Sequence, residues 1–204
     1  ALATWYEARV CYNNSAAVTP AGGRPTLASY AISEICAQAI YDHGEEAAAA
    51  VLASQNSEAV EKIVEANTLL SGIGFESGGL AMAHPLALAY TRIDRVHDTY
   101  LHGEIVAIST MAQLFLEQSS DLEKATRFFA RVGLPVHLGQ LSMSPDDSTE
   151  LDILAEVTLA NPSVRHMPVT ISQDLIRASI LGAHEFGLKT AEEIGDEAYR
   201  RLHS

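Results

Sequence analysis

Two histidines, His84 and His102, are the residues whose type and spacing best suit metal chemistry in this sequence. His84 lies inside the apolar stretch GGLAMAHPLALAY, and His102 lies at the mouth of the next apolar segment, so a helix and a turn separate them. An imidazole at a helix N-terminus feels the positive end of the helix dipole, which disfavours protonation and leaves the neutral form that binds metals. We expect Glu104 to orient the His102 ring by accepting a hydrogen bond from it.

Two histidines make only half of a zinc site, which usually takes three protein ligands and an open position. Taken alone, His84 also fits a core histidine that is hydrogen-bonded rather than metal-bound. His97 is expected in a polar loop, and Asp94 and Asp98 are expected in the same solvated loop rather than on a metal. The other histidines have no partner at ligand spacing and are expected at the surface or in hydrogen bonds; they are His137, His166 and His184.

The glycine-rich stretch before His84 does not match a phosphate-binding loop. Such a loop needs G-x-G-x-x-G between a strand and a helix, whereas Gly72, Gly74, Gly78 and Gly79 have other spacings and follow a segment with helical periodicity. We expect a turn between two helices here, with Ser77 near the N-cap of the second helix. The glycines would let neighbouring backbone come close, and Pro85 would kink the second helix just past His84.

Helical periodicity runs through the chain, and no segment alternates in the manner of a strand. Thr26 is the expected N-cap of one helix, which should end before Gly44. Cys11 and Cys36 are expected in the core. We predict an all-α bundle that forms one domain over residues 1–204, with helices over 1–16, 26–42, 45–54, from 57 to the low seventies, 78–91, 103–118, 121–132, 146–160, 172–186 and 190–202.

The composition excludes several classes of protein. A formal net charge of −13 over 204 residues argues against nucleic-acid partners and against binding to an anionic membrane surface. Two cysteines do not encode a disulfide framework, and no apolar run reaches the ~18 residues that span a bilayer. We therefore expect a cytoplasmic protein. The chain opens without Met and already in a helical pattern, so we interpret it as a piece of a longer chain.

Several stretches of the sequence match one known family. EANTLLSGIGFESGGLAMAH and HDTYLHGEIVA resemble the metal-binding region of the glycerol dehydrogenases, in the iron-containing alcohol dehydrogenase superfamily, and ALATWYEAR resembles the segment that follows the aspartate metal ligand of that family. RVGLPVHLGQL and HMPVTISQDL have counterparts in the same order. The resemblance covers essentially the whole chain. It implies the helical C-terminal domain of the dehydroquinate synthase-like fold, without the N-terminal nucleotide-binding domain.

The resemblance also implies chemistry. His84 and His102 match the two zinc-binding histidines of the family, and its aspartate ligand would immediately precede Ala1. The family oxidises glycerol to dihydroxyacetone with NAD, using one zinc, or iron, per subunit. A homo-oligomer is expected, and the 204-residue chain alone is expected to be inactive. Phe75 fits either a wall of the substrate pocket or a core position.

One departure from the family leaves the polyol open. Where members often read His-x-x-His-Asn-Gly after the first histidine, this chain has Pro85 and a run of apolar residues. The alternatives are a related polyol or sugar-phosphate dehydrogenase, a dehydroquinate-synthase-like enzyme, and a catalytically inactive helical interaction domain. Phosphorylated substrates call for Lys and Arg, which are scarce near the histidines.

Overall fold

The computed structural model describes residues 1–203. All regular structure in this described part is helical, as the sequence predicted, and no strand occurs in it. The helices group into two compact units, the first formed by Ala1–Ala81 and the second starting at Met82. That 1–204 forms one domain stays a prediction.

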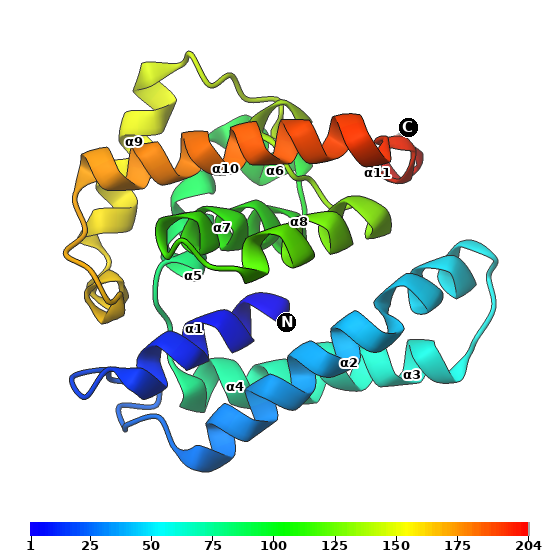
Figure 1. Ribbon diagram of the computed structural model, residues 1–204, viewed down its shortest axis with the longest axis horizontal. Coiled ribbons are helices and arrows are strands. Elements are labelled where there is room, and N and C mark those ends of the chain that lie inside the picture. Colours follow the sequence, from blue (N-terminus) through cyan, green and yellow to red (C-terminus); the bar gives the residue numbers. More distant parts are fainter. Residues whose placement is uncertain (204) are drawn as a thin grey trace. The chain divides into compact units, whose positions relative to one another are not determined.

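The first unit contains four α-helices and one π-helical turn (Figure 1). Helix α2 packs against α1, α3 and α4. The elements are α1 (Leu2–Asn13), α2 (Leu27–Leu52), α3 (Glu58–Glu65), the π-helical turn η1 (Ala66–Leu70) and α4 (Ser71–Gly78).

Helix α2 is longer than predicted. Thr26 is its N-cap, as expected: the Thr26 hydroxyl oxygen accepts from the Ser29 backbone N–H at 3.1 Å, and the Ser29 hydroxyl oxygen accepts from the Thr26 N–H at 3.0 Å. The helix continues through Gly44 to Leu52, so the predicted end at Gly44 was wrong. A glycine costs a helix only ~1 kcal/mol, and the EEAAAA run that follows consists of strong helix formers.

The glycine-rich stretch lies inside a helix rather than in a turn. Helices α3 and α4 are joined without a break by η1, and Ser57 caps the start of α3 by accepting from the Val60 N–H at 3.3 Å. Ser77 therefore lies within α4 and is not an N-cap. The chain leaves the helix at Gly79, whose φ of +100° is a conformation that suits glycine.

The glycines of α4 do allow close packing, as the sequence predicted. A Cβ at position 74 would lie 2.6 Å from both the Ser33 hydroxyl oxygen and the Thr4 methyl carbon. Cys11 and Cys36 are buried, as expected, and burial raises the pKa of Cys11 to about 12. The Cys11 thiol donates to the carbonyl of Leu80 at 3.1 Å. These contacts fix α4 against α1 and α2.

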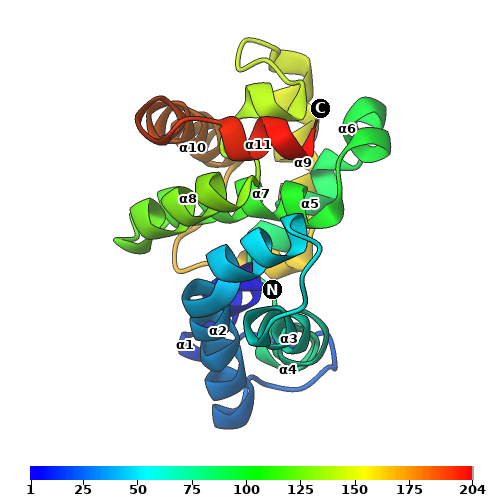
Figure 2. The same cartoon turned by 90° about the vertical axis from the view of Figure 1, so that its right-hand side faces the viewer.

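The second unit is built around α7, most of whose side chains are buried. Helix α7 packs against α5, α8 and α10, and Figure 2 shows α11 beside α8. The elements are α5 (Ala83–Tyr90), α6 (Asp94–Thr99), α7 (His102–Leu116), α8 (Asp121–Val132), the 3₁₀ turn η2 (Leu138–Leu141), α9 (Ser148–Ala160), the 3₁₀ turn η3 (Pro162–His166), α10 (Gln173–Ile194) and α11 (Glu197–Leu202).

The helices of the second unit follow the predicted ranges except at three places. The short helix α6 was not predicted. The expected break near Gly187 does not occur, and α10 runs through this residue. The absence of a side chain at Gly187 lets the Val136 carbonyl approach the helix closely. The break comes instead at Gly195, where φ is +87°. The helix predicted over 78–91 starts only at Ala83.

Pro85 does not kink α5. Because α5 starts at Ala83, Pro85 lies in its first turn, where a backbone N–H has no partner within the helix anyway. The first bond of the helix ladder is donated by the next residue, from the Leu86 N–H to the Met82 carbonyl at 2.9 Å. The predicted kink was therefore wrong. None of the helices in residues 1–203 combines the length and the apolar character needed to cross a bilayer.

The close approach at Gly74 yields a stability prediction with an internal control. Gly74→Ala should lower the free energy of unfolding by about 1–3 kcal/mol, because the new methyl group would collide with Thr4 and Ser33. Gly72→Ala, in the same helix with nothing within 4 Å of the added Cβ, should raise it by about 0.5–1 kcal/mol. Urea titrations of both variants measure the difference. Equal effects would contradict the packing role of Gly74.

Candidate metal centre

The structure brings His84 and His102 together. His84 is the second residue of α5 and His102 is the first residue of α7, two helices that pack against each other. The centroids of the two imidazole rings are 6.0 Å apart and the ring planes are tilted by 34°. His84 is half-buried and His102 is more exposed. The two side chains therefore converge on one place at the N-terminal ends of two helices.

This separation fits two ligands of one ion. With zinc–nitrogen bonds of ~2.0–2.1 Å in a tetrahedral arrangement, two imidazole ring centres lie ~5 Å apart, about 1 Å closer than the ring centres of His84 and His102. Within residues 1–203, no third His, Cys, Asp or Glu joins the pair to form a metal-binding group. The pair therefore supplies two nitrogen ligands and leaves the remaining coordination positions to other groups.

The pKa of His102 is shifted in the direction that the sequence suggested. Burial, and then the neighbouring His84, lower the pKa of His102. The neutral imidazole that results is the form that binds a metal ion. Its location in the first turn of α7, expected from the sequence, is observed.

Gln113 positions the first turn of α5, and sequence reasoning missed it. Its side-chain oxygen, fully buried on α7, accepts from the backbone N–H groups of Met82 at 3.0 Å and Ala83 at 2.9 Å. Its side-chain nitrogen donates to the Glu117 carboxylate at 2.8 Å. His84 follows directly after these two amides. One side chain of α7 therefore fixes the helix start that carries His84, while α7 itself carries His102.

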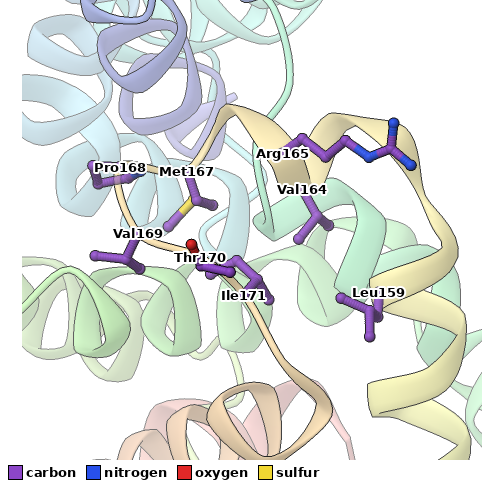
Figure 3. Close-up of a pocket in the computed structure, with 8 residues that line it drawn as sticks. All are labelled: Leu159, Val164, Arg165, Met167, Pro168, Val169, Thr170 and Ile171. Atoms are coloured by element: carbon purple, nitrogen blue, oxygen red, sulfur yellow. The ribbon is translucent and has the colours of Figure 1, made fainter.

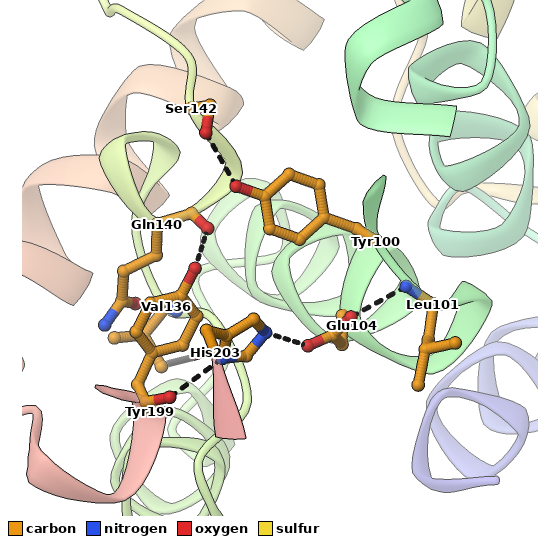
Figure 4. Close-up of polar contacts among 8 residues, drawn as sticks. All are labelled: Tyr100, Leu101, Glu104, Val136, Gln140, Ser142, Tyr199 and His203. Atoms are coloured by element: carbon orange, nitrogen blue, oxygen red, sulfur yellow. Dashed lines mark hydrogen bonds and ion pairs between the residues drawn. The ribbon is translucent and has the colours of Figure 1, made fainter. Parts of the chain in front are cut away.

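Glu104 does not have the predicted role beside His102. One carboxylate oxygen accepts from the backbone N–H of Leu101 at 2.7 Å, and the other pairs with Nε2 of His203 (Figure 4). The physical reason is helix capping: Glu104 is the third residue of α7, and a carboxylate at that position reaches back to the open N–H before the helix.

Comparison with known proteins identifies the relatives of this arrangement. A glycerol dehydrogenase from Escherichia coli O6:H1 is 40% identical over 196 residues, which cover 95% of this chain and 53% of that protein. The crystal structure of glycerol dehydrogenase from Schizosaccharomyces pombe matches with a TM-score of 0.88 and 32% identity, over 95% of this chain and 50% of that one. This chain is a homologue of the glycerol dehydrogenases. It spans about half the length of the curated relatives it matches.

A more distant likeness supports the predicted fold class. The structure of an iron-containing alcohol dehydrogenase from Thermococcus thioreducens matches with a TM-score of 0.66 and 17% identity, over 90% of this chain and 48% of that one. At this identity the likeness shows the fold alone. The all-α architecture expected for the C-terminal part of such a protein is confirmed. No family model matches the sequence.

The other positions that the sequence singled out lie on elements other than α5 and α7. Phe75 is on α4 in the first unit with 36% of its surface exposed, and its role as a pocket wall stays a prediction. His97 lies in the short helix α6 rather than in a loop, where its Nδ1 is 3.1 Å from the exposed Asp98 carboxylate. Asp94 starts the same helix. His166 ends η3 and is half-buried.

His137 and His184 form a second close pair, which the sequence did not predict. Their ring centroids are 6.0 Å apart with the rings at 68°, and His184 is buried. Nδ1 of His184 accepts from the Leu138 N–H at 3.1 Å, so the ring proton is on Nε2. Neither nitrogen of His184 then offers a lone pair to a metal ion. This pair is therefore structural. The hydrogen bond to His184 agrees with the expectation that this histidine lies either at the surface or in a hydrogen bond.

A surface pocket lies elsewhere in the second unit (Figure 3). It is lined at the end of α9, in η3 and along the segment that leads into α10, by Leu159, Val164, Arg165, Met167, Pro168, Val169, Thr170 and Ile171. Arg165 extends away from the apolar side chains that face the hollow. Neither His84 nor His102 lines this pocket, so it is separate from the candidate metal centre.

The hydrogen bonds of Gln113 predict a large loss of stability when they are removed. Gln113→Met keeps the side-chain volume but leaves two buried backbone donors without an acceptor, so the free energy of unfolding should fall by about 2–5 kcal/mol. The matched control is Gln173→Met at the exposed start of α10, which should change it by less than about 0.5 kcal/mol. Urea titration measures both. An equally small effect at Gln113 would show that the two amides find other partners.

The pair of His137 and His184 predicts a pH dependence of stability. Burial lowers the pKa of His184, against the opposing carboxylate of Glu185, and burial followed by His184 lowers the pKa of His137, against Asp196. With these lowered pKa values, the unfolded chain binds more protons than the folded chain at mildly acidic pH. The contribution of the two histidines to the free energy of unfolding is therefore highest above the ordinary histidine pKa of about 6.5 and decreases as the pH falls below it.

Unfolding free energies at pH 7.5 and pH 5.5 provide the test of this pair. The wild-type protein should be less stable at the lower pH. His184→Asn keeps an oxygen in place of Nδ1 to accept from Leu138 but does not titrate, so the decrease should become smaller. The exposed His97→Asn is the control and should leave the decrease unchanged. A pH dependence that His184→Asn does not alter would assign it to other groups.

Proposed function

We propose that this chain is the metal- and substrate-binding part of an NAD-dependent glycerol dehydrogenase that oxidises glycerol to dihydroxyacetone. The observation that carries the proposal is the convergence of His84 and His102, 6.0 Å apart between ring centroids, in a chain 40% identical to a glycerol dehydrogenase. Neither feature alone would be sufficient, because histidine pairs also occur as structural contacts, as His137 and His184 illustrate.

In this proposal the complete subunit has an N-terminal nucleotide-binding domain before the 1–204 helical part. The third metal ligand is the family's aspartate, which the resemblance places immediately before Ala1. NAD is held mainly by the N-terminal domain, across a cleft from the metal. The subunit is a cytoplasmic homo-oligomer in this proposal.

His84 and His102 would hold the metal ion, for which we propose zinc, with iron as the alternative. When bound, zinc supplies Lewis acidity that eases loss of the substrate hydroxyl proton. The protein provides the geometry: Gln113 fixes the turn that carries His84, and α7 provides His102 directly. Apolar residues of α5 follow His84 and are buried, among them Leu86 and Ala87, so this side of His84 is shielded from water.

Phosphorylated substrates are less well supported. Such substrates require cationic groups near the reacting centre. Between positions 79 and 112 the sequence has two of these groups, Arg92 and Arg95. The guanidinium of Arg95 is paired with the carboxylate of Glu150, and it also donates to the Ser142 carbonyl at 3.0 Å. A small uncharged polyol suits this environment better than a sugar phosphate.

Histidine substitutions in the complete subunit test the proposed metal ligands. His102→Ala should lose most of the bound zinc and lower alcohol oxidation by more than about 100-fold, since losing a ligand should exceed the loss of a supporting residue. NAD binding should be nearly unchanged because the cofactor sits on the other domain. The measurements are zinc content by atomic spectroscopy and titration with NAD.

His97→Ala is the matched control, since His97 is an exposed histidine five positions earlier on the neighbouring helix α6. It should retain zinc and activity. Loss of zinc in His97→Ala together with retention in His102→Ala would refute the ligand assignment. A wild-type subunit that binds no divalent metal and does not reduce NAD with any polyol would favour the helical interaction domain instead.

A further inference from the structure

The first turn of α7 depends on Glu104. A helix begins with N–H groups that have no partner inside the helix, and the Glu104 carboxylate satisfies the one at Leu101, at 2.7 Å. Glu104 is only 8% exposed, whereas Leu101 is exposed, so the bond between them is partly buried. His102 lies between Leu101 and Glu104. Its imidazole is therefore carried by the backbone turn that this carboxylate closes.

The second oxygen of Glu104 is engaged by a residue 99 positions later. Nε2 of His203 pairs with it, and Nδ1 of the same ring is 2.8 Å from the carbonyl oxygen of Tyr199 (Figure 4). Carboxylates and carbonyls only accept hydrogen bonds, so both ring nitrogens must carry a proton for both bonds to form. The His203 ring also stacks on the Tyr199 ring, with centroids 4.0 Å apart and planes at 19°.

Tyr199 and Tyr100 connect this arrangement to the segment 136–142. The Tyr199 hydroxyl donates to the backbone carbonyl of Gln140, and the side-chain oxygen of Gln140 accepts from the Val136 N–H at 2.8 Å. The Tyr100 hydroxyl is 2.7 Å from the Ser142 hydroxyl. Tyr100 and Glu104, two positions before and two positions after His102, are thus each held by side-chain contacts, as Figure 4 shows.

We propose that His203 is a positioning residue for the metal centre: by holding the Glu104 carboxylate against the Leu101 amide, it keeps the first turn of α7 closed and the His102 imidazole beside His84. This inference rests on the proposed function, because it assumes that His102 binds the metal. His203 itself does not bind the metal or touch the substrate. Its effect reaches the ion through Glu104 and the backbone of α7.

The physical consequence is a change in the fraction of molecules ready to bind. Without His203, the Glu104 carboxylate loses one of its two partners and regains freedom to turn away from Leu101. Opening of the first turn displaces His102, so only molecules with a closed turn bind the metal ion. The apparent metal affinity is therefore the intrinsic affinity multiplied by the fraction of molecules with a closed turn. Since loss of a residue that directly supports a ligand costs 10–100-fold in affinity, we expect about 3–10-fold for this more remote one.

The experiment compares His203→Leu with His203→Gln in the complete subunit. Glutamine retains an N–H donor at roughly the place of Nε2, whereas leucine retains only bulk. Zinc affinity is measured by competition with a chromophoric chelator, and amide hydrogen exchange over residues 101–106 is measured by mass spectrometry on the metal-free protein. His203→Leu should bind zinc about 3–10-fold more weakly and exchange faster there, and His203→Gln should restore both at least in part.

His97→Leu is the control for replacing an exposed histidine and should alter neither measurement. Circular dichroism confirms that each variant is folded. Unchanged zinc affinity in His203→Leu, with wild-type zinc binding intact, would overturn the positioning role. Equal losses in His203→Leu and His203→Gln would overturn the claim that the donor to Glu104 is what matters. A wild-type subunit that binds no zinc would instead refute the proposed function, while the exchange data would still decide whether His203 closes the turn.

Discussion

Buried backbone amides must be hydrogen-bonded, and this constraint sets the position of His84. After the chain leaves α4 at Gly79, the N–H groups of Met82 and Ala83 are buried before α5 provides acceptors of its own. Water does not reach them, and an unmet buried donor costs about 1–3 kcal/mol. Gln113 accepts from both. The start of α5 is therefore fixed to α7 by the need to satisfy two amides, and the pairing of His84 with His102 follows.

The other buried polar side chains of α7 show why Gln113 has this role. The Ser109 and Thr110 hydroxyls donate to carbonyls one turn back in their own helix, to Ile105 at 2.8 Å and Val106 at 2.7 Å. Such local bonds satisfy a buried hydroxyl without involving a second helix. The longer amide of Gln113 reaches across to α5 and also contacts Glu117 on its own helix. Length and two-sided hydrogen bonding distinguish it from its neighbours.

Most helices could be predicted from the sequence because periodicity and capping residues are local signals. Thr26 caps the helix it was expected to cap, and the helix expected to start at position 57 is capped by Ser57. The helix ends predicted at Gly44 and Gly187 were wrong, because the sequence alone does not distinguish a glycine inside a helix from a glycine that follows one. The candidate site shows the same difference between local signals in the sequence and contacts between distant residues. His84 and His102 were predicted from residue type and spacing, but Gln113 and His203 contact residues 30 and 99 positions away, and no local pattern marks them.

The two candidate ligands share a location that constrains the rest of the proposed site. Both lie in the first turn of a helix, where the dipole presents partial positive charge. This favours neutral imidazoles but also opposes a divalent cation, and two neutral nitrogen ligands do nothing to reduce the charge of that cation. A third histidine would leave the imbalance in place, whereas a carboxylate would reduce it. The aspartate implied by the resemblance has the negative charge that would reduce this imbalance in the proposed site.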